Sequence, residues 1–167
     1  MRLVDVFDRH GCDRGSSRHR YDRLYEVAPS PARLLEIGIF KGAGIASWLE
    51  WFPNADIVGV DTFQRVPPEK IAILNHPRVT WFKGDSRTVE LSGKFDWIID
   101  DGCHDAAVQL ATFRHLYPML AEGGRYFIED VWPGKPGYDE LRQALNGAIL
   151  HDFKQKQDSF ILEIHDA

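Results

Sequence analysis

Residues 95–104 read Phe95-Asp96-Trp97-Ile98-Ile99-Asp100-Asp101-Gly102-Cys103-His104, an apolar run that ends in two acids, a glycine and a histidine. This pattern is typical of a buried parallel strand whose carboxyl end opens into a functional crevice. A second stretch, residues 124–130, is again apolar and again closes with two acids, Glu129 and Asp130. Because consecutive strands are often neighbours in one sheet, we expect the two strand ends to lie about 5 Å apart.

Four carboxylates would then crowd one edge of the sheet, namely those of Asp100, Asp101, Glu129 and Asp130. Two unit charges 4 Å apart repel by roughly 4 kcal/mol at an effective dielectric of about 20, so the acids must be protonated or neutralised by a cation. Oxygen ligands of this kind suit Mg²⁺, Ca²⁺ or Mn²⁺ better than Zn²⁺. The alternative is that the acids cap the helices that follow. Capping explains one acid at each strand end but not two at both, so we predict a divalent metal site.

His104 stands three residues beyond Asp101, at the start of a predicted helix over residues 105–120. A lone histidine is more often a surface or structural residue. Its place directly after the predicted metal site, and an unperturbed pKa of about 6.5, favour a role as a general base.

A glycine turn earlier in the chain follows the first convincing strand, residues 33–37. Gly38 begins this turn, and Gly42 and Gly44 lead into a predicted helix over residues 44–52. The next strand, residues 57–60, ends at an acid, Asp61, where Rossmann-type folds hold ribose hydroxyls. The turn lets backbone approach a ligand at a helix amino end, although a tight packing turn is the alternative. Glu36, a buried acid next to the turn, needs a partner, such as a ligand amino group or the amides of the turn.

The remaining elements complete an alternation of strands and helices. A third strand, residues 79–83, closes at Asp85 and Ser86, which could hold an adenine ring or form an Asx turn. The other predicted elements are helices over 21–28, 67–75 and 138–148 and a terminal hairpin of residues 151–156 and 159–165. This order predicts an α/β fold, a Rossmann-like doubly wound, mostly parallel seven-stranded sheet with an antiparallel C-terminal hairpin.

Length and composition agree with a single domain over residues 1–167. Within it we expect a mobile amino-terminal segment (1–20), a core that binds cofactor and metal (33–130) and the hairpin (150–165). The net charge of −5 argues against a nucleic-acid partner, and no apolar run approaches the ~20 residues of a membrane span. The two cysteines lack metal-ligand spacing and make no disulfide framework, which indicates a reduced, cytoplasmic setting.

Taken together, these motifs resemble the class I S-adenosylmethionine-dependent methyltransferases. Glu36-Ile37-Gly38 with Gly42 resembles the first motif of that family, and Asp61 resembles its ribose-binding acid. Gly84-Asp85-Ser86 resembles the motif on the adenine side.

A narrower resemblance is to metal-dependent macrolide-sugar O-methyltransferases, whose fourth strand usually ends in Asp-Asp-Gly-Ser-His. This chain has Cys103 in place of that serine. The resemblance implies that Asp101, Glu129 and Asp130 bind Mg²⁺ and that His104 is the base. Residues 13–26 resemble that family's segment that closes over the cofactor.

The implied function is methyl transfer from S-adenosylmethionine to a hydroxyl, with a vicinal diol on a sugar or a catechol-like natural product as the fitting acceptor. A partner subunit or second copy could complete the acceptor pocket. Two alternatives stay open: an NAD-dependent oxidoreductase on the same scaffold, and a non-catalytic cofactor-binding subunit. The predicted cofactor-binding residues are Tyr21, Glu36, Gly38, Phe40, Lys41, Gly42, Asp61, Thr62, Asp85, Ser86 and Asp100.

Overall fold

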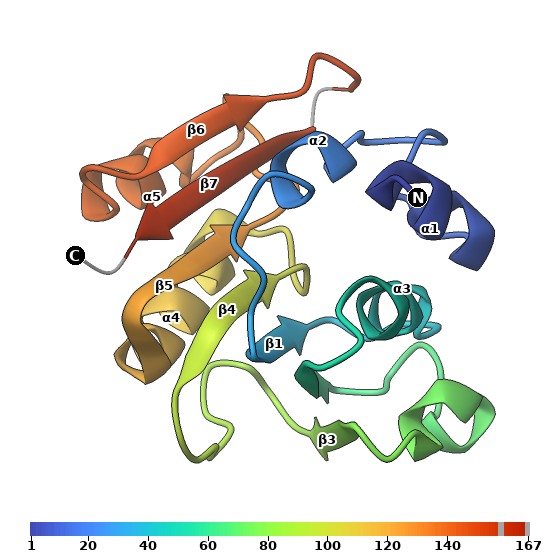
Figure 1. Cartoon of the computed structure of the whole chain (residues 1–167). Helices are drawn as coiled ribbons and strands as arrows, with labels where there is room; N and C mark the ends of the chain where they lie inside the picture. Colours follow the sequence, from blue (N-terminus) through green and yellow to red (C-terminus); the bar gives the residue numbers. More distant parts are fainter. Residues whose placement is uncertain (157–158, 166–167) are drawn as a thin grey trace.

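A twisted seven-stranded sheet forms the centre of the computed structural model, which describes residues 1–156 and 159–165 (Figure 1). The strands lie in the order β3-β2-β1-β4-β5-β7-β6. Strands β1 to β5 are parallel, whereas β7 runs antiparallel to both β5 and β6. The predicted fold class is therefore confirmed. The strand bounds are β1 (Arg33–Ile37), β2 (Asp56–Asp61), β3 (Val79–Lys83), β4 (Phe95–Asp100), β5 (Leu120–Ile128), β6 (Ile149–Asp152) and β7 (Phe160–His165).

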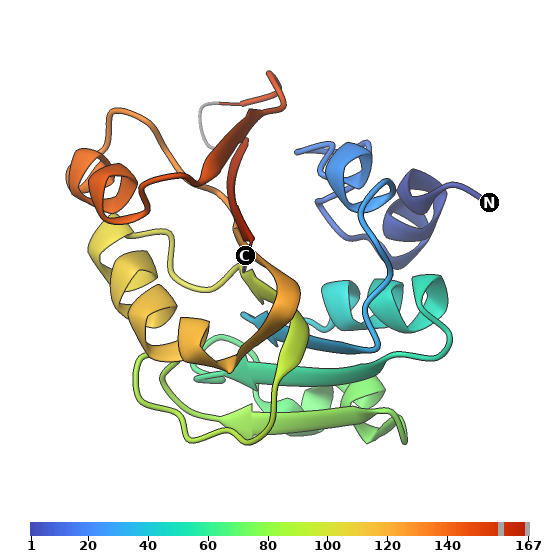
Figure 2. The ribbon, with the colours of Figure 1, turned by 60° about the vertical axis from the view of Figure 1, so that its left-hand side comes forward.

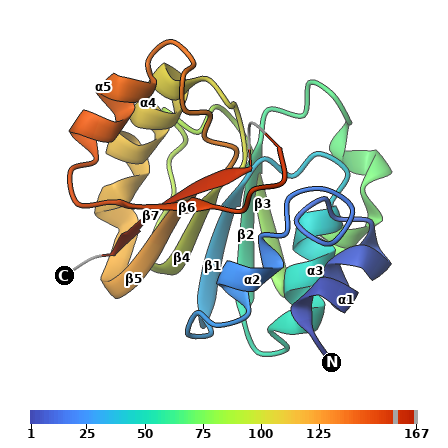
Figure 3. The ribbon, with the colours of Figure 1, turned by 90° about the horizontal axis from the view of Figure 1, so that it is seen from above.

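Helices cover both faces of this sheet (Figures 2 and 3). One face carries α1 (Leu3–His10), α2 (Asp22–Tyr25) and α3 (Ala43–Trp51). The other face carries α4 (Ala106–Leu116) and α5 (Tyr138–Ala144). Three short 3-10 turns complete the described elements: η1 (Pro68–Lys70), η2 (Ala72–Asn75) and η3 (Tyr117–Met119).

The core falls into two apolar clusters because side chains alternate between the faces of a strand. Trp97 and Ile99 of β4 belong to the cluster beneath α1 and α3, whereas Ile98 belongs to the cluster beneath α4 and α5. Backbone pairing continues one residue past each strand, since Asp101 N donates to the Ile37 carbonyl and Glu129 N to the Asp100 carbonyl. The alternation therefore places Asp101 and Glu129 on the α1–α3 side of the sheet.

The amino terminus departs from the prediction of a mobile segment over residues 1–20. Residues 3–10 form helix α1, which buries the side chains of Leu3, Val6 and Phe7 against the core. Gly11 ends the helix in the left-handed conformation, with φ of 68°. The helix was not predicted because its apolar residues span only Leu3 to Phe7 and a long polar stretch follows Gly11.

Four predicted helices are shorter than expected or broken. The helix predicted over 21–28 is only the single turn α2, Asp22–Tyr25. The stretch 67–75 forms η1 and η2 rather than one helix, since Ile71 takes a non-helical conformation between them. Residues 105–120 divide into α4, η3 and the first residue of β5. Strand β5 begins at Leu120 because the chain pairs with Phe95 before an irregularity in the register, so Gly123 and Gly124 lie within the strand rather than in a turn. The helix predicted over 138–148 ends at Ala144.

The terminal hairpin is confirmed as the antiparallel pair β6–β7, while its predicted turn at residues 157–158 lies outside the described residues. In the part of the chain that the structure describes, no helix combines the length and the apolar character needed to cross a bilayer.

Glu163 of β7 allows the contribution of a buried ion-pair cluster to the stability of the hairpin to be tested. Its buried carboxylate accepts hydrogen bonds from Arg125, His151 and His165. Burial acts to raise the pKa of Glu163, but these donors outweigh it and lower the pKa to about 2. A lowered folded-state pKa stabilises the protein above the unfolded value of about 4.3, and this stabilisation is lost as the pH falls toward 2.

We therefore expect Glu163→Gln to lower the free energy of unfolding by about 2 kcal/mol at pH 7 and by progressively less between pH 4.5 and 2. Urea unfolding at a series of pH values measures the difference. The exposed Glu122 of β5 supplies the matched control, Glu122→Gln, which should leave the curve unchanged. A Glu163→Gln deficit that is constant with pH would contradict the assignment.

Candidate functional site

The chain reverses its direction of progress across the sheet between β1 and β4, which are neighbours although β2 and β3 separate them in sequence. In doubly wound folds, ligands bind outside the carboxyl ends of the strands at such a switch point. Gly38 follows β1 there with φ of 92°, and a Cβ at this position would collide with the backbone carbonyl of Asp101. Glycine is thus required for the ends of β1 and β4 to approach one another.

The glycine turn leads into α3 through Gly42, which is the helix N-cap and has φ of 83°. Phe40 within the turn also has a positive φ and is half exposed. Asp61, at the end of β2, holds the turn: its Oδ2 accepts from the amides of Ile39 (2.8 Å) and Phe40 (2.9 Å). Its Oδ1 accepts from the amide of Phe63. A carboxylate has about four acceptor sites, so Asp61 keeps capacity for a ligand hydroxyl.

Five further residues of the predicted cofactor set line the same edge of the sheet. Lys41 and Thr62 are exposed beside the turn. At the end of β3, Asp85 forms an ion pair with Arg87, and the hydroxyl of Ser86 lies 2.8 Å from that of Thr112. Asp100 is buried beside the glycine turn, and its Oδ1 accepts from the Gly102 amide at 3.3 Å. The position of these residues supports the cofactor site, and their individual roles remain predictions.

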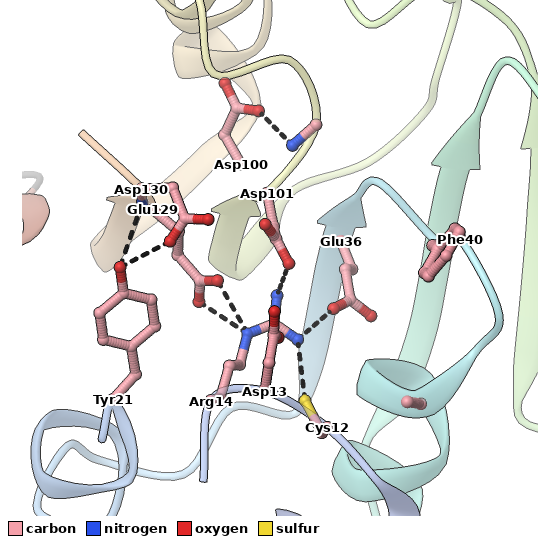
Figure 4. Close-up of polar contacts among 12 residues, drawn as sticks. Cys12, Asp13, Arg14, Tyr21, Glu36, Phe40, Asp100, Asp101, Glu129 and Asp130 are labelled. Atoms are coloured by element: carbon pink, nitrogen blue, oxygen red, sulfur yellow. Dashed lines mark hydrogen bonds and ion pairs between the residues drawn. The ribbon is translucent and has the colours of Figure 1, made fainter. Parts of the chain in front are cut away.

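Tyr21 lies elsewhere. Its ring is fully buried and its hydroxyl donates to Oδ1 of Asp130 at 2.6 Å (Figure 4). In this arrangement Tyr21 supports an acid of the predicted metal site rather than the glycine turn.

The acids of β1, β4 and β5 meet around one guanidinium (Figure 4). Arg14, only 2% exposed, donates from Nη1 to Glu36 (2.6 Å), from Nη2 to Asp101 Oδ2 (2.9 Å) and from Nε to both oxygens of Glu129 (2.8 and 2.9 Å). Tyr25 also donates its hydroxyl to Glu129 Oε1. The expected convergence of the two strand ends is therefore present, and a side chain of the protein supplies one neutralising cation.

His104 lies on the outer side of this cluster. Its Nε2 is 3.4 Å from Asp101 Oδ1, and its Nδ1 is 3.4 Å from Asp130 Oδ2. Each of these three residues offers one ligand atom, and the three atoms lie within 4.8 Å of one another. Two carboxylates and an imidazole at this separation suit a divalent cation. Glu129, predicted as the third acidic ligand, faces Arg14 instead and is not one of this group.

Electrostatics distinguish the acids of the cluster. Burial acts to raise the pKa of Asp101, but the charges of Arg14 and His104 lower it below its ordinary value. Burial raises the pKa of Glu129, against the opposing effects of Arg14 and the Tyr25 hydroxyl. Burial also raises the pKa of Asp100 to about 7. Negative charge is thus favoured on Asp101, one of the two carboxylates that face His104.

His104 responds to the same acids. Burial acts to lower the pKa of its imidazole, but Asp101 and Asp130 outweigh this and raise the pKa above its ordinary value. An added cation would compete with the proton for these carboxylates and would favour the neutral imidazole that a base requires.

Arg14 and Tyr25 are the residues of the site whose contacts sequence reasoning missed. Both lie in a segment rich in basic and aromatic residues, but their partners stand up to 115 residues away in the chain. The signal that could have identified Arg14 is the charge balance: several acids at one buried edge require an internal cation.

A family model described as a methyltransferase domain matches residues 35–131 of the chain. Among curated proteins, a tetracenomycin-C rhamnosyl 3′-O-methyltransferase of Streptomyces olivaceus is 34% identical over 150 residues. The L-olivosyl-oleandolide 3-O-methyltransferase of Streptomyces antibioticus is 36% identical over 157 residues. These alignments cover 78% and 83% of this chain but only 37% and 39% of the relatives, so the chain spans less than half of their length.

Solved structures show the same fold. The MycE methyltransferase of the mycinamycin biosynthetic pathway, in complex with Mg, SAH and mycinamycin VI, superposes with a TM-score of 0.79 at 21% identity. The match covers all of this chain and 54% of that one. A Podospora anserina methyltransferase bound to SAH matches with a TM-score of 0.68 at 18% identity, over 99% of this chain and 87% of that one.

Proposed function

The chain belongs to the family of methyltransferase domains whose model matches residues 35–131, and from this premise we propose that it transfers a methyl group from S-adenosylmethionine to a sugar hydroxyl. The observation that carries the proposal is the convergence of Asp101, His104 and Asp130 at the carboxyl ends of β4 and β5. A base flanked by two acids suits removal of a hydroxyl proton.

S-adenosylmethionine lies in this proposal across the ends of β1, β2 and β3. The turn that contains Gly38 and Gly42 lets the ligand approach the protein backbone closely. Asp61 accepts hydrogen bonds from the ribose hydroxyls through the acceptor capacity that the turn amides leave free. Asp85 and Ser86 lie at the adenine end. The sulfonium supplies an electrophilic methyl group, so the protein mainly has to position and deprotonate the acceptor.

A divalent cation, Mg²⁺ by the chemistry of its oxygen ligands, would be held by Asp101 and Asp130, with Glu129 as a third acid if it turns from Arg14. When bound, such a cation lowers the pKa of a hydroxyl that it contacts. His104 takes the proton of that hydroxyl while the oxygen forms its bond to the methyl carbon and the carbon–sulfur bond breaks. The products are the methyl ether, S-adenosylhomocysteine and a proton on His104.

Both the relatives and the site support a proposal for the acceptor class. The two curated relatives are named as O-methyltransferases of a rhamnosyl and an olivosyl natural product. A sugar with adjacent hydroxyl groups fits a site that presents oxygen ligands and a base side by side, since both hydroxyls can bind at once. We propose a glycosylated small molecule with a vicinal diol as the acceptor.

Two measurements test the proposal. Titration calorimetry should show binding of S-adenosylmethionine and none of NAD, which separates methyl transfer from hydride transfer on the same scaffold. A methyl-transfer assay with Mg²⁺ and a panel of deoxysugar glycosides should then give a methyl ether. Binding of the cofactor without turnover on any member of the panel would favour a non-catalytic cofactor-binding subunit instead.

A further inference from the structure

We propose that Arg14 is a positioning residue for the metal site, holding its carboxylates from the inner side so that their outer oxygens face His104. This inference rests on the proposed function, because it assigns a role in binding the divalent cation. Arg14 itself contacts none of the reacting atoms in the proposal and acts through the acids to which it donates.

The contacts of Arg14 and His104 divide the oxygens of the cluster into two sets, and Figure 4 shows the set that faces Arg14. Arg14 engages Oδ2 of Asp101 and both oxygens of Glu129. The oxygens that lie toward His104 are Oδ1 of Asp101 and Oδ2 of Asp130, each 3.4 Å from the ring. The oxygens of the first set are therefore covered by the Arg14 guanidinium. The oxygens of the second set face His104, whose side chain is partly exposed.

Arg14 is itself held rigidly. Its guanidinium is buried and lies 5.5 Å from the Trp48 ring centroid, within cation–π distance. Gly44 leaves room for it: a Cβ there would collide with the Glu36 carboxylate and with Nη1 of Arg14. A planar guanidinium that donates to three carboxylates at the ends of three different strands fixes their relative positions through its rigid fork of donors, which an ammonium group lacks.

The neighbouring tyrosines serve the same acids. Tyr25 donates to Glu129, and Tyr21 donates to Asp130. Residues 14–25 thus provide a hydrogen-bond donor to each of the three acids in the predicted ligand set, Asp101, Glu129 and Asp130. Hydrogen-bond partners of ligating carboxylates orient them, and their loss typically weakens metal binding by about 10- to 100-fold.

The test is the affinity for Mn²⁺, used as the probe and measured by electron paramagnetic resonance of the free ion and by calorimetry. We expect Arg14→Met to bind Mn²⁺ about 10- to 100-fold more weakly than the wild-type chain. Arg14→Lys, which keeps the charge but loses the planar fork, should recover part of the affinity. Tyr21→Phe keeps the ring packing and removes a single donor to Asp130, which belongs to the candidate ligand group, so it should show a several-fold loss even if the Arg14 variants fold poorly.

Arg78→Met is the matched control. Arg78 is a partly buried arginine that donates to the backbone carbonyls of Leu49, Phe52 and Ala55 and not to the acids of the cluster. Its loss should reduce thermal stability without changing the Mn²⁺ affinity of the folded protein. If Arg14 only stabilised the fold, Arg14→Met would likewise lower thermal stability and leave the Mn²⁺ affinity unchanged.

Each remaining outcome is decisive. Unchanged Mn²⁺ affinity in folded Arg14→Met, or in Tyr21→Phe if the Arg14 variants do not fold, would overturn the positioning role. Tighter binding in Arg14→Met would also overturn it, because it would show that the guanidinium competes with the cation for the acids. Failure of the wild-type chain to bind Mn²⁺ would overturn the proposed metal site, and the positioning role with it, and so is distinguishable from the other two results.

Discussion

Replacement of His104 by alanine is expected to lower the turnover of methyl transfer by about 10²- to 10⁴-fold, the usual contribution of a general base. The imidazole lies between Asp101 and Asp130, which are its ion-pair partners among the described residues. Cofactor binding should therefore survive the substitution. Initial rates at saturating cofactor, together with calorimetry of S-adenosylmethionine, separate the two effects.

His115→Ala is the control for this experiment. His115 is also exposed on α4 and lies 2.9 Å from the carbonyl of Val89, away from the acids. Its loss should leave turnover unchanged. If His104→Ala retained most of the wild-type turnover, the proton would have to leave by another route and the role given to His104 would be wrong.

Removal of divalent cations should have the second large effect. Chelation by EDTA is expected to reduce turnover by about 100-fold or more, since a cation that polarises the reacting oxygen contributes several kcal/mol to the barrier. Added Mg²⁺ or Mn²⁺ should restore the wild-type rate. Asp130→Asn removes a ligand that the geometry places beside His104, so its rate should stay low at the same cation concentration.

Asp139→Asn provides the comparison, because Asp139 is an exposed acid in the first turn of α5 with no part in the cluster. Its dependence on the cation should match that of the wild-type chain. Full activity after exhaustive chelation would show that the acids serve a purpose other than holding a cation.

The strands of the sheet could be predicted because their signals are local. Ile57–Val60 and Phe95–Asp100 are apolar runs closed by acids, and such runs are typical of strands buried on both faces. Helix α1 was missed because its apolar spacing is brief and a polar, turn-rich stretch follows it directly. The start of β5 was missed because two consecutive glycines usually indicate a turn, whereas here Gly124 packs against neighbouring backbone that leaves no room for a side chain.

The sequence was sufficient to predict which acids gather at the candidate site, but not which partner each of them contacts. Two acids at each of two parallel strand ends were sufficient to place Asp101 and Asp130 beside His104. The sequence around Glu129 did not indicate that its carboxylate would face Arg14. That orientation depends on Arg14, which lies 115 residues earlier in the chain and packs against this end of the sheet. Asp61 shows the same limit: its position at the end of β2 was evident, but its hydrogen bonds to the turn amides depend on a positive φ at Phe40.

The contacts of Arg14 also constrain the order in which the molecule is assembled. Its partners Glu36, Asp101 and Glu129 lie 22, 87 and 115 residues further along the chain. Contacts of such separation require large loops to close and therefore form late in folding. During synthesis Arg14 is therefore made before any of its acids, and its complete set of ion pairs can form only after Glu129 has left the ribosome.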